Sequence, residues 1–255
     1  MGLDVYVGTF TRYLVGDWEL ASAQVARELG VELEIVRAEP EPEDTITDPD
    51  VVRDAVLEWR SGLAGALGTE LSWSEADAMP YFTDKPSWSS YSALLLLAAH
   101  DEHPELPLPE QVPDDPSTEP LLRAVLPEKR KGLLRRARGP DEPPRYFALY
   151  TPEVWLPCLL ESPWQAPFVT GQEMVMSSVE SLHTQLRELA RSHDEALESW
   201  RATEPAVEST LELGDQSVEL LAAGSLADEA YYALDMLLRL TEVGVEHRLP
   251  VKLDY

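Results

Sequence analysis

The sequence predicts an α/β or α+β fold, with 255 residues in one helix-rich domain around a small sheet that can mix parallel and antiparallel strands. Two observations predict it. Apolar and polar residues alternate at 3–7, 31–36 and 250–254, which is the period of a half-buried strand. Between these segments, apolar residues recur every three or four positions, as in amphipathic helices. The sheet is therefore expected to include both the N-terminal and the C-terminal strand.

The sequence pattern of the N-terminal 36 residues predicts a strand, a helix and a second strand. The alternation at 3–7 returns at 31–36. Between the two we expect a helix with Asp17 as its N-cap and Gly30 as its stop. If the two strands are parallel, the three elements form a right-handed βαβ unit.

Two helices are expected next. Asp48 is a suitable N-cap, with Pro49 at the first helical position. The apolar stripe of this helix consists of Val52, Ala55, Val56, Trp59 and Leu63. A second helix, largely buried, is expected from Ser87 to about His103, where Pro104 ends it.

The middle of the chain is rich in proline. Six prolines between residues 104 and 120 predict an exposed surface connection. Strand-like segments at 145–150 and 154–156 lie in another proline-spaced stretch and are expected to be edge strands or short ribbons. We expect one domain over residues 1–255, with a division into 1–103 and 121–255 as the alternative.

The last third predicts two helices and a strand. The apolar stripe of the first helix is Val179, Leu182, Leu186 and Leu189. The second begins at Ser225, has Asp228 in the position of a capping box, and ends at Gly244. The strand at 250–254 is too short to stand alone, so we expect it to pair with the N-terminal strand.

The charge is strongly acidic. Asp and Glu number 47 against 20 Lys and Arg, for a formal net charge of −27. Such a charge repels nucleic acid and anionic membrane surfaces, and it attracts basic proteins. The basic residues between 129 and 138 are expected to pair with the protein's own acids. The single cysteine, Cys158, favours a reducing compartment and thus the cytoplasm.

No motif for a cofactor or a metal is found. The chain has no glycine-rich nucleotide motif, nucleophile elbow or zinc signature. His100 and His103 share a helix face, but two ligands do not make a site. The acidic stretch 39–50 lacks the glycine and the spacing of a calcium loop. Apolar runs reach seven residues, at 93–99, too few to cross a membrane. We expect no cofactor, no structural metal and no membrane span.

Two groups of residues are candidate sites. The first is an aromatic cluster with a carboxylate, and it consists of Trp73, Tyr81, Asp84, Trp88 and Tyr91. Rigid rings beside polar groups are typical of pockets and of protein-binding hot spots, although aromatic residues also fill cores. The second group is Arg12 and Tyr13, which follow the first predicted strand, where ligands bind in open parallel sheets.

Two classes of function fit these features. The first is a non-enzymatic protein that binds or inhibits a basic protein through its acidic surface and an aromatic anchor. The alternative is an enzyme or small-molecule-binding protein with a pocket lined by the aromatic cluster. Asp84 would be an electrostatic anchor in the first case and a general base in the second.

Overall fold

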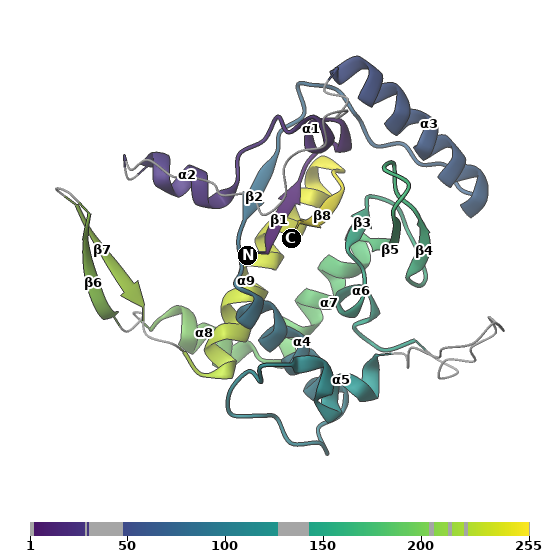
Figure 1. The fold of residues 1–255 in the computed structure, drawn as a ribbon. Coiled ribbons are helices and arrows are strands. Elements are labelled where there is room, and N and C mark those ends of the chain that lie inside the picture. Colours follow the sequence, from purple (N-terminus) through teal and green to yellow (C-terminus); the bar gives the residue numbers. More distant parts are fainter. Residues whose placement is uncertain are drawn as a thin grey trace.

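A six-stranded mixed sheet organises the computed structural model of the chain, which describes residues 3–28, 30, 48–126, 143–203, 207–213, 216–221 and 224–254 (Figure 1). The strand order is β2-β1-β8-β3-β5-β4. The strands are β1 Asp4–Val7, β2 Phe82–Asp84, β3 Val154–Leu156, β4 Trp164–Pro167, β5 Glu173–Ser178 and β8 Val251–Asp254. A separate antiparallel ribbon, β6 Val207–Leu213 with β7 Gln216–Leu221, extends away from the body of the molecule (Figure 1).

The two ends of the described chain pair with each other, as the sequence predicts. β1 and β8 are antiparallel, with Asp4 opposite Asp254 and Val7 opposite Val251. β8 also pairs with β3, so it lies inside the sheet. Of the pairs in this sheet, β3 with β5 is parallel and the others are antiparallel. The predicted strand at 31–36 lies outside the described residues.

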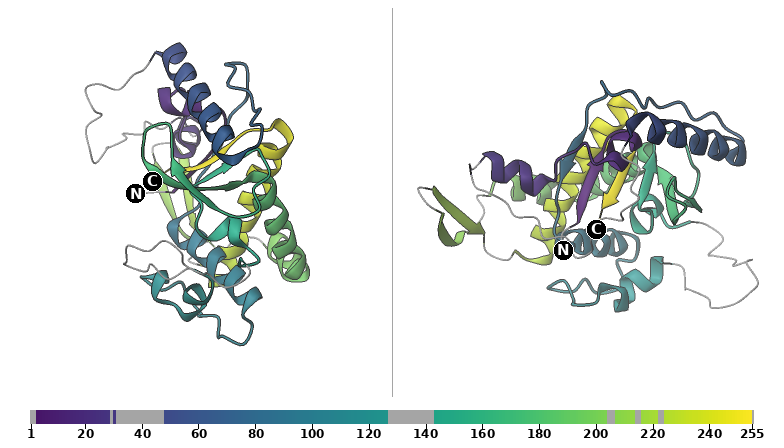
Figure 2. Two further views of the ribbon diagram at one scale, coloured as in Figure 1. Left: turned by 90° about the vertical axis from the view of Figure 1, so that its right-hand side faces the viewer. Right: turned by 45° about the horizontal axis from the view of Figure 1, so that its top comes forward.

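Helices cover both faces of the sheet (Figure 2). They are α1 Phe10–Val15, α2 Ala21–Glu28, α3 Pro49–Leu67, α4 Trp88–Glu102, α5 Pro120–Val125, α6 Phe147–Tyr150, α7 Val179–Ser192, α8 Asp194–Arg201 and α9 Leu226–His247, with a 3₁₀ turn at Pro116–Thr118. Three predicted starts are confirmed. Asp48 caps α3 with Pro49 at its first position, Ser87 caps α4, and Ser225 with Asp228 forms a capping box on α9.

The larger core lies between one face of the sheet and the helices α4, α7 and α9. β1 contributes Val5 and Val7 to it, β8 contributes Val251 and Leu253, and β3 contributes Trp155. The indole N–H of Trp155 donates to the carbonyl of Ala148 at 2.6 Å. The alternation at the two ends of the chain thus marks the residues that face this core.

A smaller core lies on the opposite face, under α1 and α3. Val154 and Leu156 point into it while Trp155, between them, points into the larger core. Phe10 from α1 sits at its centre, edge-on to the ring of Phe168. Because both faces are covered, residues of β1 and β8 that alternation assigns to solvent are buried as well.

Several predicted elements differ from the observed ones. The helix predicted to begin directly after Asp17 begins only at Ala21, and a separate helix, α1, precedes Asp17. Asp17 is not an N-cap but an ion-pair partner of Arg12 at 3.3 Å. Helix α9 continues past Gly244 to His247, where Arg248 adopts a left-handed conformation with φ 53°. Gly30 does have the positive φ expected of a helix stop.

The proline-spaced stretch also differs. Residues 147–150 form a helical turn, not a strand, because Glu102 accepts the backbone N–H groups of Arg145 and Tyr146 and starts the turn there. β3 lies between β8 and β5, so it is an inner strand and not an edge strand. Part of the proline-rich 104–120 connection is anchored, since Leu106, Leu108 and Val112 pack against the larger core.

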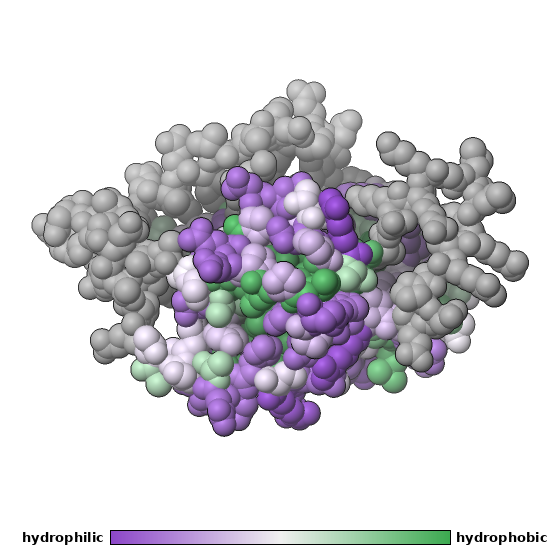
Figure 3. All heavy atoms as spheres, turned by 90° about the horizontal axis from the view of Figure 1, so that it is seen from below, coloured by the Kyte–Doolittle hydropathy of each residue, from purple (hydrophilic) through white to green (hydrophobic). Residues whose placement is uncertain are grey.

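The outer surface is mainly hydrophilic. On the face seen from below, polar residues surround a small group of apolar ones (Figure 3). No helix in the described part of the chain is long and apolar enough to cross a bilayer. The basic stretch 129–138 and most of the acidic stretch 39–50 lie outside the described residues.

Candidate functional site

The five residues of the predicted aromatic cluster do not come together. Trp73 is 2% exposed in the smaller core, edge-on to Phe10, and its indole N–H donates to Glu75 at 2.7 Å. Tyr91 is buried in the larger core, on the other side of the sheet, and its hydroxyl donates to the carbonyl of Leu149. These two residues are therefore part of the packing.

Asp84 and Trp88 lie on the surface, near the junction of β2 with α4. Trp88 opens helix α4 and is 42% exposed. Tyr232, on the neighbouring helix α9, is 43% exposed. Ser90 donates a hydrogen bond to Glu229, which fixes the start of α4 against the first turns of α9. We call Asp84, Trp88, Glu229 and Tyr232 the Trp88 surface.

Charged groups surround the two exposed rings of the Trp88 surface. Asp84 is 3.8 Å from the guanidinium of Arg239, which is also 3.4 Å from Asp235. Burial of its hydroxyl raises the pKa of Tyr232, and the nearby Asp84 carboxylate raises it further. The carboxylate of Asp84 is thus near enough to Tyr232 to affect its pKa, and the contact of Asp84 with Arg239 is longer than a hydrogen bond.

The other sequence candidates, Arg12 and Tyr13, do lie together with Tyr81. All three surround Tyr6, whose ring centroid is 5.3 Å from that of Tyr13 and 6.4 Å from that of Tyr81. The guanidinium of Arg12 lies 5.1 Å from the centre of the Tyr81 ring, and it donates to the carbonyls of Met79 at 2.7 Å and Asp77 at 2.8 Å. Two N–H groups of Arg12 thus hold the 77–81 segment, and a third, on Nε, donates to Asp17.

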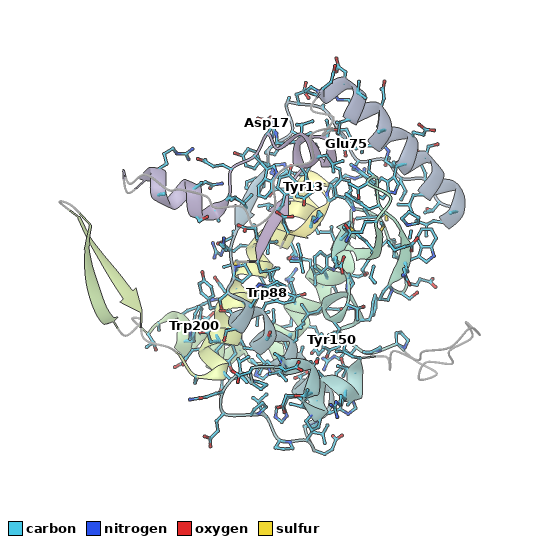
Figure 4. The ribbon with its side chains drawn as sticks, viewed as in Figure 1. Tyr13, Asp17, Glu75, Trp88, Tyr150 and Trp200 are labelled. Atoms are coloured by element: carbon cyan, nitrogen blue, oxygen red, sulfur yellow. The ribbon has the colours of Figure 1, made fainter. Side chains whose placement is uncertain are left out.

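Helix α1 is placed by a buried carboxylate that the sequence analysis did not single out. Glu75 is 5% exposed, and it accepts the backbone N–H groups of Phe10 at 3.3 Å and Thr11 at 2.8 Å, besides the indole of Trp73. Figure 4 shows Glu75, Tyr13 and Asp17 at the same end of the sheet, with Trp88 well apart from them. Glu75 therefore fixes the helix from which Tyr13 projects.

A buried lysine lies beside Tyr13. The side chain of Lys252 on β8 is 8% exposed. Its ammonium donates to the carbonyl of Leu253 at 2.7 Å, lies 3.7 Å from the carboxylate of Asp254, and is 4.7 Å from the centre of the Tyr13 ring. Burial lowers the pKa of Lys252, although the nearby Asp254 and Glu153 act in the opposite direction.

Tyr13 and Asp254 form a second contact at this place. The Tyr13 hydroxyl donates to Asp254 Oδ1 at 2.5 Å, a short hydrogen bond. Burial of the phenol and the adjacent carboxylate raise the pKa of Tyr13, so the hydroxyl keeps its proton at neutral pH. The Tyr13 hydroxyl and the Lys252 ammonium therefore both lie near Oδ1 of Asp254, and all three groups can hold or move a proton.

These groups form one wall of a small pocket of about 180 Å³. Phe168 and Met174, from the end of β4 and from β5, give it an apolar side, and Thr170 and Gln172 of the turn between them lie at its exposed rim. Its remaining lining residues are Tyr13, Glu153, Lys252, Leu253 and Asp254. We call this the Lys252 pocket.

Next to the pocket, two acids face each other across the sheet. Asp4 is directly opposite Asp254 and is paired with Lys85 at 3.2 Å. Burial raises the pKa of Asp4; Lys85 lowers it again in part, and Asp254 adds a smaller upward effect. Asp4 Oδ1 has no hydrogen-bond partner among the described residues.

His100 and His103 serve local structure in this fold. His100 Nδ1 contacts the carbonyl of Leu106, and His103 Nδ1 contacts Glu105, so the two point to different partners. In the part of the chain that the structure describes, no three His, Cys, Asp or Glu side chains are grouped to hold a metal ion. No family model, curated protein or solved structure matches this chain.

Proposed function

We propose that the protein is a binding protein that takes up a basic segment of a partner protein at the Trp88 surface. The exposure of two aromatic side chains among carboxylates carries this proposal. Large rings that stay exposed in a folded chain are typical anchors of protein interfaces. Trp88 and Tyr232 are each more than two-fifths exposed, with Asp84 and Glu229 beside them.

The charge of the whole chain supports the choice of a basic partner. A net charge of −27 creates a field that speeds the approach of cationic segments and slows that of anionic ones. At the surface itself, Arg239 holds Asp84 only at 3.8 Å. An arginine or lysine of a partner can replace this contact with a direct hydrogen bond while its aliphatic stem covers Trp88 or Tyr232.

The alternative function, a pocket made by the aromatic cluster, has less support. Trp73 and Tyr91 belong to two cores on opposite faces of the sheet, so they do not line one cavity with Asp84. A general base also needs the proton of a bound substrate within hydrogen-bond reach. Asp84 instead accepts the backbone N–H of Lys85 at the surface.

Binding of short synthetic peptides tests the proposal. The probe is an arginine- and lysine-rich peptide, compared with a peptide in which glutamate replaces each basic residue, and binding is followed by tryptophan fluorescence and calorimetry. We expect binding of the basic peptide alone, and we expect it to weaken as salt shortens the screening length from about 30 Å at 0.01 M to about 8 Å at 0.15 M.

Variants then locate the binding surface. Trp88→Ala is expected to weaken binding by about tenfold or more, as at an interface hot spot, and Asp84→Asn to weaken it mainly at low salt. Val51→Ala is the matched control, because Val51 is a 50% exposed apolar residue on α3. Equal peptide affinity for the Trp88→Ala and Val51→Ala proteins would refute the assignment of this surface.

A further inference from the structure

The Lys252 pocket has no part in the proposed partner binding, and its chemistry is of another kind. We propose that it is a separate ligand site in which Lys252 forms a Schiff base with a small, uncharged aldehyde or ketone. The pocket is on the face of the sheet covered by α1, whereas the Trp88 surface is formed by β2, α4 and α9. This inference goes beyond the proposed function and does not depend on it.

The lysine is held in place by the sheet. β8 pairs with β1 on one side and β3 on the other, and Lys252 is opposite Tyr6 and Val154. A side chain that starts from an inner strand is positioned more exactly than one on a loop. Lys252 lines the pocket, and its ammonium donates one short hydrogen bond, to the Leu253 carbonyl. An ammonium has three N–H groups, so others can bind a ligand.

Burial of Lys252 disfavours its charged form and so favours the free amine that nucleophilic attack requires, while Asp254 and Glu153 act in the opposite direction. The side chain of Lys252 is 8% exposed, and the face of the Tyr13 ring lies 4.7 Å from its nitrogen, a contact that itself favours the ammonium. Desolvation disfavours the ammonium form, which is the usual way in which proteins activate lysine for attack on carbonyl groups. The charged and titratable groups that surround it are Tyr6, opposite it on β1, Tyr13 from α1, Glu153 before β3, and Asp254 from β8.

Tyr13 and Asp254 are placed to move the protons of this reaction. The amine nitrogen attacks the carbonyl carbon, and the oxygen takes a proton from the Tyr13 hydroxyl to give a carbinolamine. Asp254 accepts the proton that the nitrogen loses. The proton on Asp254 returns to the Tyr13 oxygen, which restores both groups. The carbinolamine hydroxyl then takes a proton from Tyr13 and leaves as water while a C=N bond forms, and the second proton of the nitrogen passes through Asp254 back to Tyr13. One carbonyl compound and one amine give one imine and one water, with no oxidant or reductant.

Size and charge select the ligand class. A pocket of about 180 Å³ is smaller than the roughly 300 to 1,000 Å³ of pockets for drug-sized ligands, so only a small molecule fits. The carboxylates of Glu153 and Asp254 disfavour an anion such as a 2-oxo acid. Phe168 and Met174 offer an apolar wall to a short alkyl group.

Trapping of the imine tests this inference. The intact protein is treated with propanal and cyanoborohydride near pH 7, and the modified lysines are identified by peptide mapping. Lys85 is the internal reference, because it is more exposed and is ion-paired with Asp4 at 3.2 Å. A positioned acid and base contribute on the order of 10²-fold or more in rate, so Lys252 is expected to react at least about tenfold faster than Lys85.

Three variants and a second probe decide the outcome. Tyr13→Phe and Asp254→Asn should each slow the labelling of Lys252 without changing that of Lys85, and Lys252→Met should abolish the fast phase. Glyoxylate, an anionic aldehyde, should label Lys252 more slowly than propanal does. Labelling of Lys85 in the wild-type protein at the same rate as Lys252, or faster, refutes the inference, and this result needs no variant to fold.

Discussion

Replacement of Glu75 by alanine offers the sharpest test of how α1 is held. In the folded chain its carboxylate accepts the N–H groups of Phe10 and Thr11 and the indole N–H of Trp73, at 3.3, 2.8 and 2.7 Å. Glu75→Ala leaves these three buried donors without their acceptor. We therefore expect the first turn of α1 to lose the acceptor of two of its N–H groups, while Thr9 still caps the helix at Arg12, and Trp73 to lose its polar contact.

The magnitude follows from the three bonds. A buried donor left unsatisfied costs about 1 to 3 kcal/mol. The loss is reduced because a pocket of about 160 Å³ beside Thr9 and Thr11 can admit water to the freed N–H groups. We expect a net destabilisation of about 3 kcal/mol, equal to a fall in melting temperature on the order of 6 to 12 °C for a chain of this size.

Urea unfolding followed by tryptophan fluorescence measures this loss, with Glu70→Ala as the control. Glu70 is an exposed acid five residues away, so its removal should change the unfolding free energy by no more than about 0.5 kcal/mol. The same Glu75→Ala protein should also label Lys252 more slowly, because Tyr13 projects from the helix whose first-turn N–H groups Glu75 accepts. A loss below about 1 kcal/mol would show that this carboxylate does not hold α1.

Three further predictions concern packing and pH. In urea unfolding, Trp73→Ala should lower the free energy of unfolding by about 3 to 5 kcal/mol, and Trp88→Ala by less than about 1 kcal/mol. Equal losses for the two variants would contradict the placement of Trp73 in the core and Trp88 on the surface. Because the pKa of Asp4 is raised, the folded chain binds the proton of the Asp4 carboxyl more tightly than the unfolded chain does. Binding of this proton stabilises the folded chain below the unfolded pKa near 3.8, and the stabilisation is lost as pH rises through the folded pKa. Relative to Asp4→Asn, the wild-type protein should therefore lose stability as pH rises above about 4, and a pH-independent difference between the two in urea would count against the shift. Gly8→Ala should destabilise by about 1 to 3 kcal/mol because a Cβ there overlaps the Tyr6 ring, whereas Gly62→Ala, on α3 with open space around it, should stabilise by about 0.5 kcal/mol in thermal unfolding.

Local signals in the sequence predicted local structure well. The N-caps at Asp48 and Ser225 depend on side chains that bond to backbone groups two or three residues away, so they can be found without knowledge of the fold. The alternation at both ends of the chain gave the pairing of β1 with β8. The caps can be recognised from local residues alone, whereas the strand β8 also required the expectation of a sheet for it to join.

Elements set by distant contacts were missed. The turn at 147–150 begins where Glu102, more than forty residues earlier, accepts two backbone N–H groups, and no local pattern contains that information. The alternation at 250–254 is that of a half-buried strand, and in such a strand Lys252 lies on the polar face. Alternation tells which residues share a face, but not that α1 lies over that face and turns it into a second interior.

The candidate site shows the same limit of local signals. Trp73 and Tyr91 are close in sequence, yet a strand and a turn between them carry the chain from one face of the sheet to the other. Tyr13 and Asp254 are 241 residues apart and share a hydrogen bond. Only the pairing of the two chain ends, which the alternation predicted, could have suggested that they are neighbours.

The position of β8 inside the sheet affects how the chain can fold. β8 separates β2 and β1 from β3, β5 and β4, and it follows β5 by more than seventy residues. During synthesis the two halves of the sheet must therefore wait, each with an unpaired inner edge, until the last described strand leaves the ribosome. Contacts of such long sequence separation form slowly, and exposed strand edges recruit other chains. A nascent chain stalled before residue 251 is thus expected to depend on chaperones in a way that the finished protein does not.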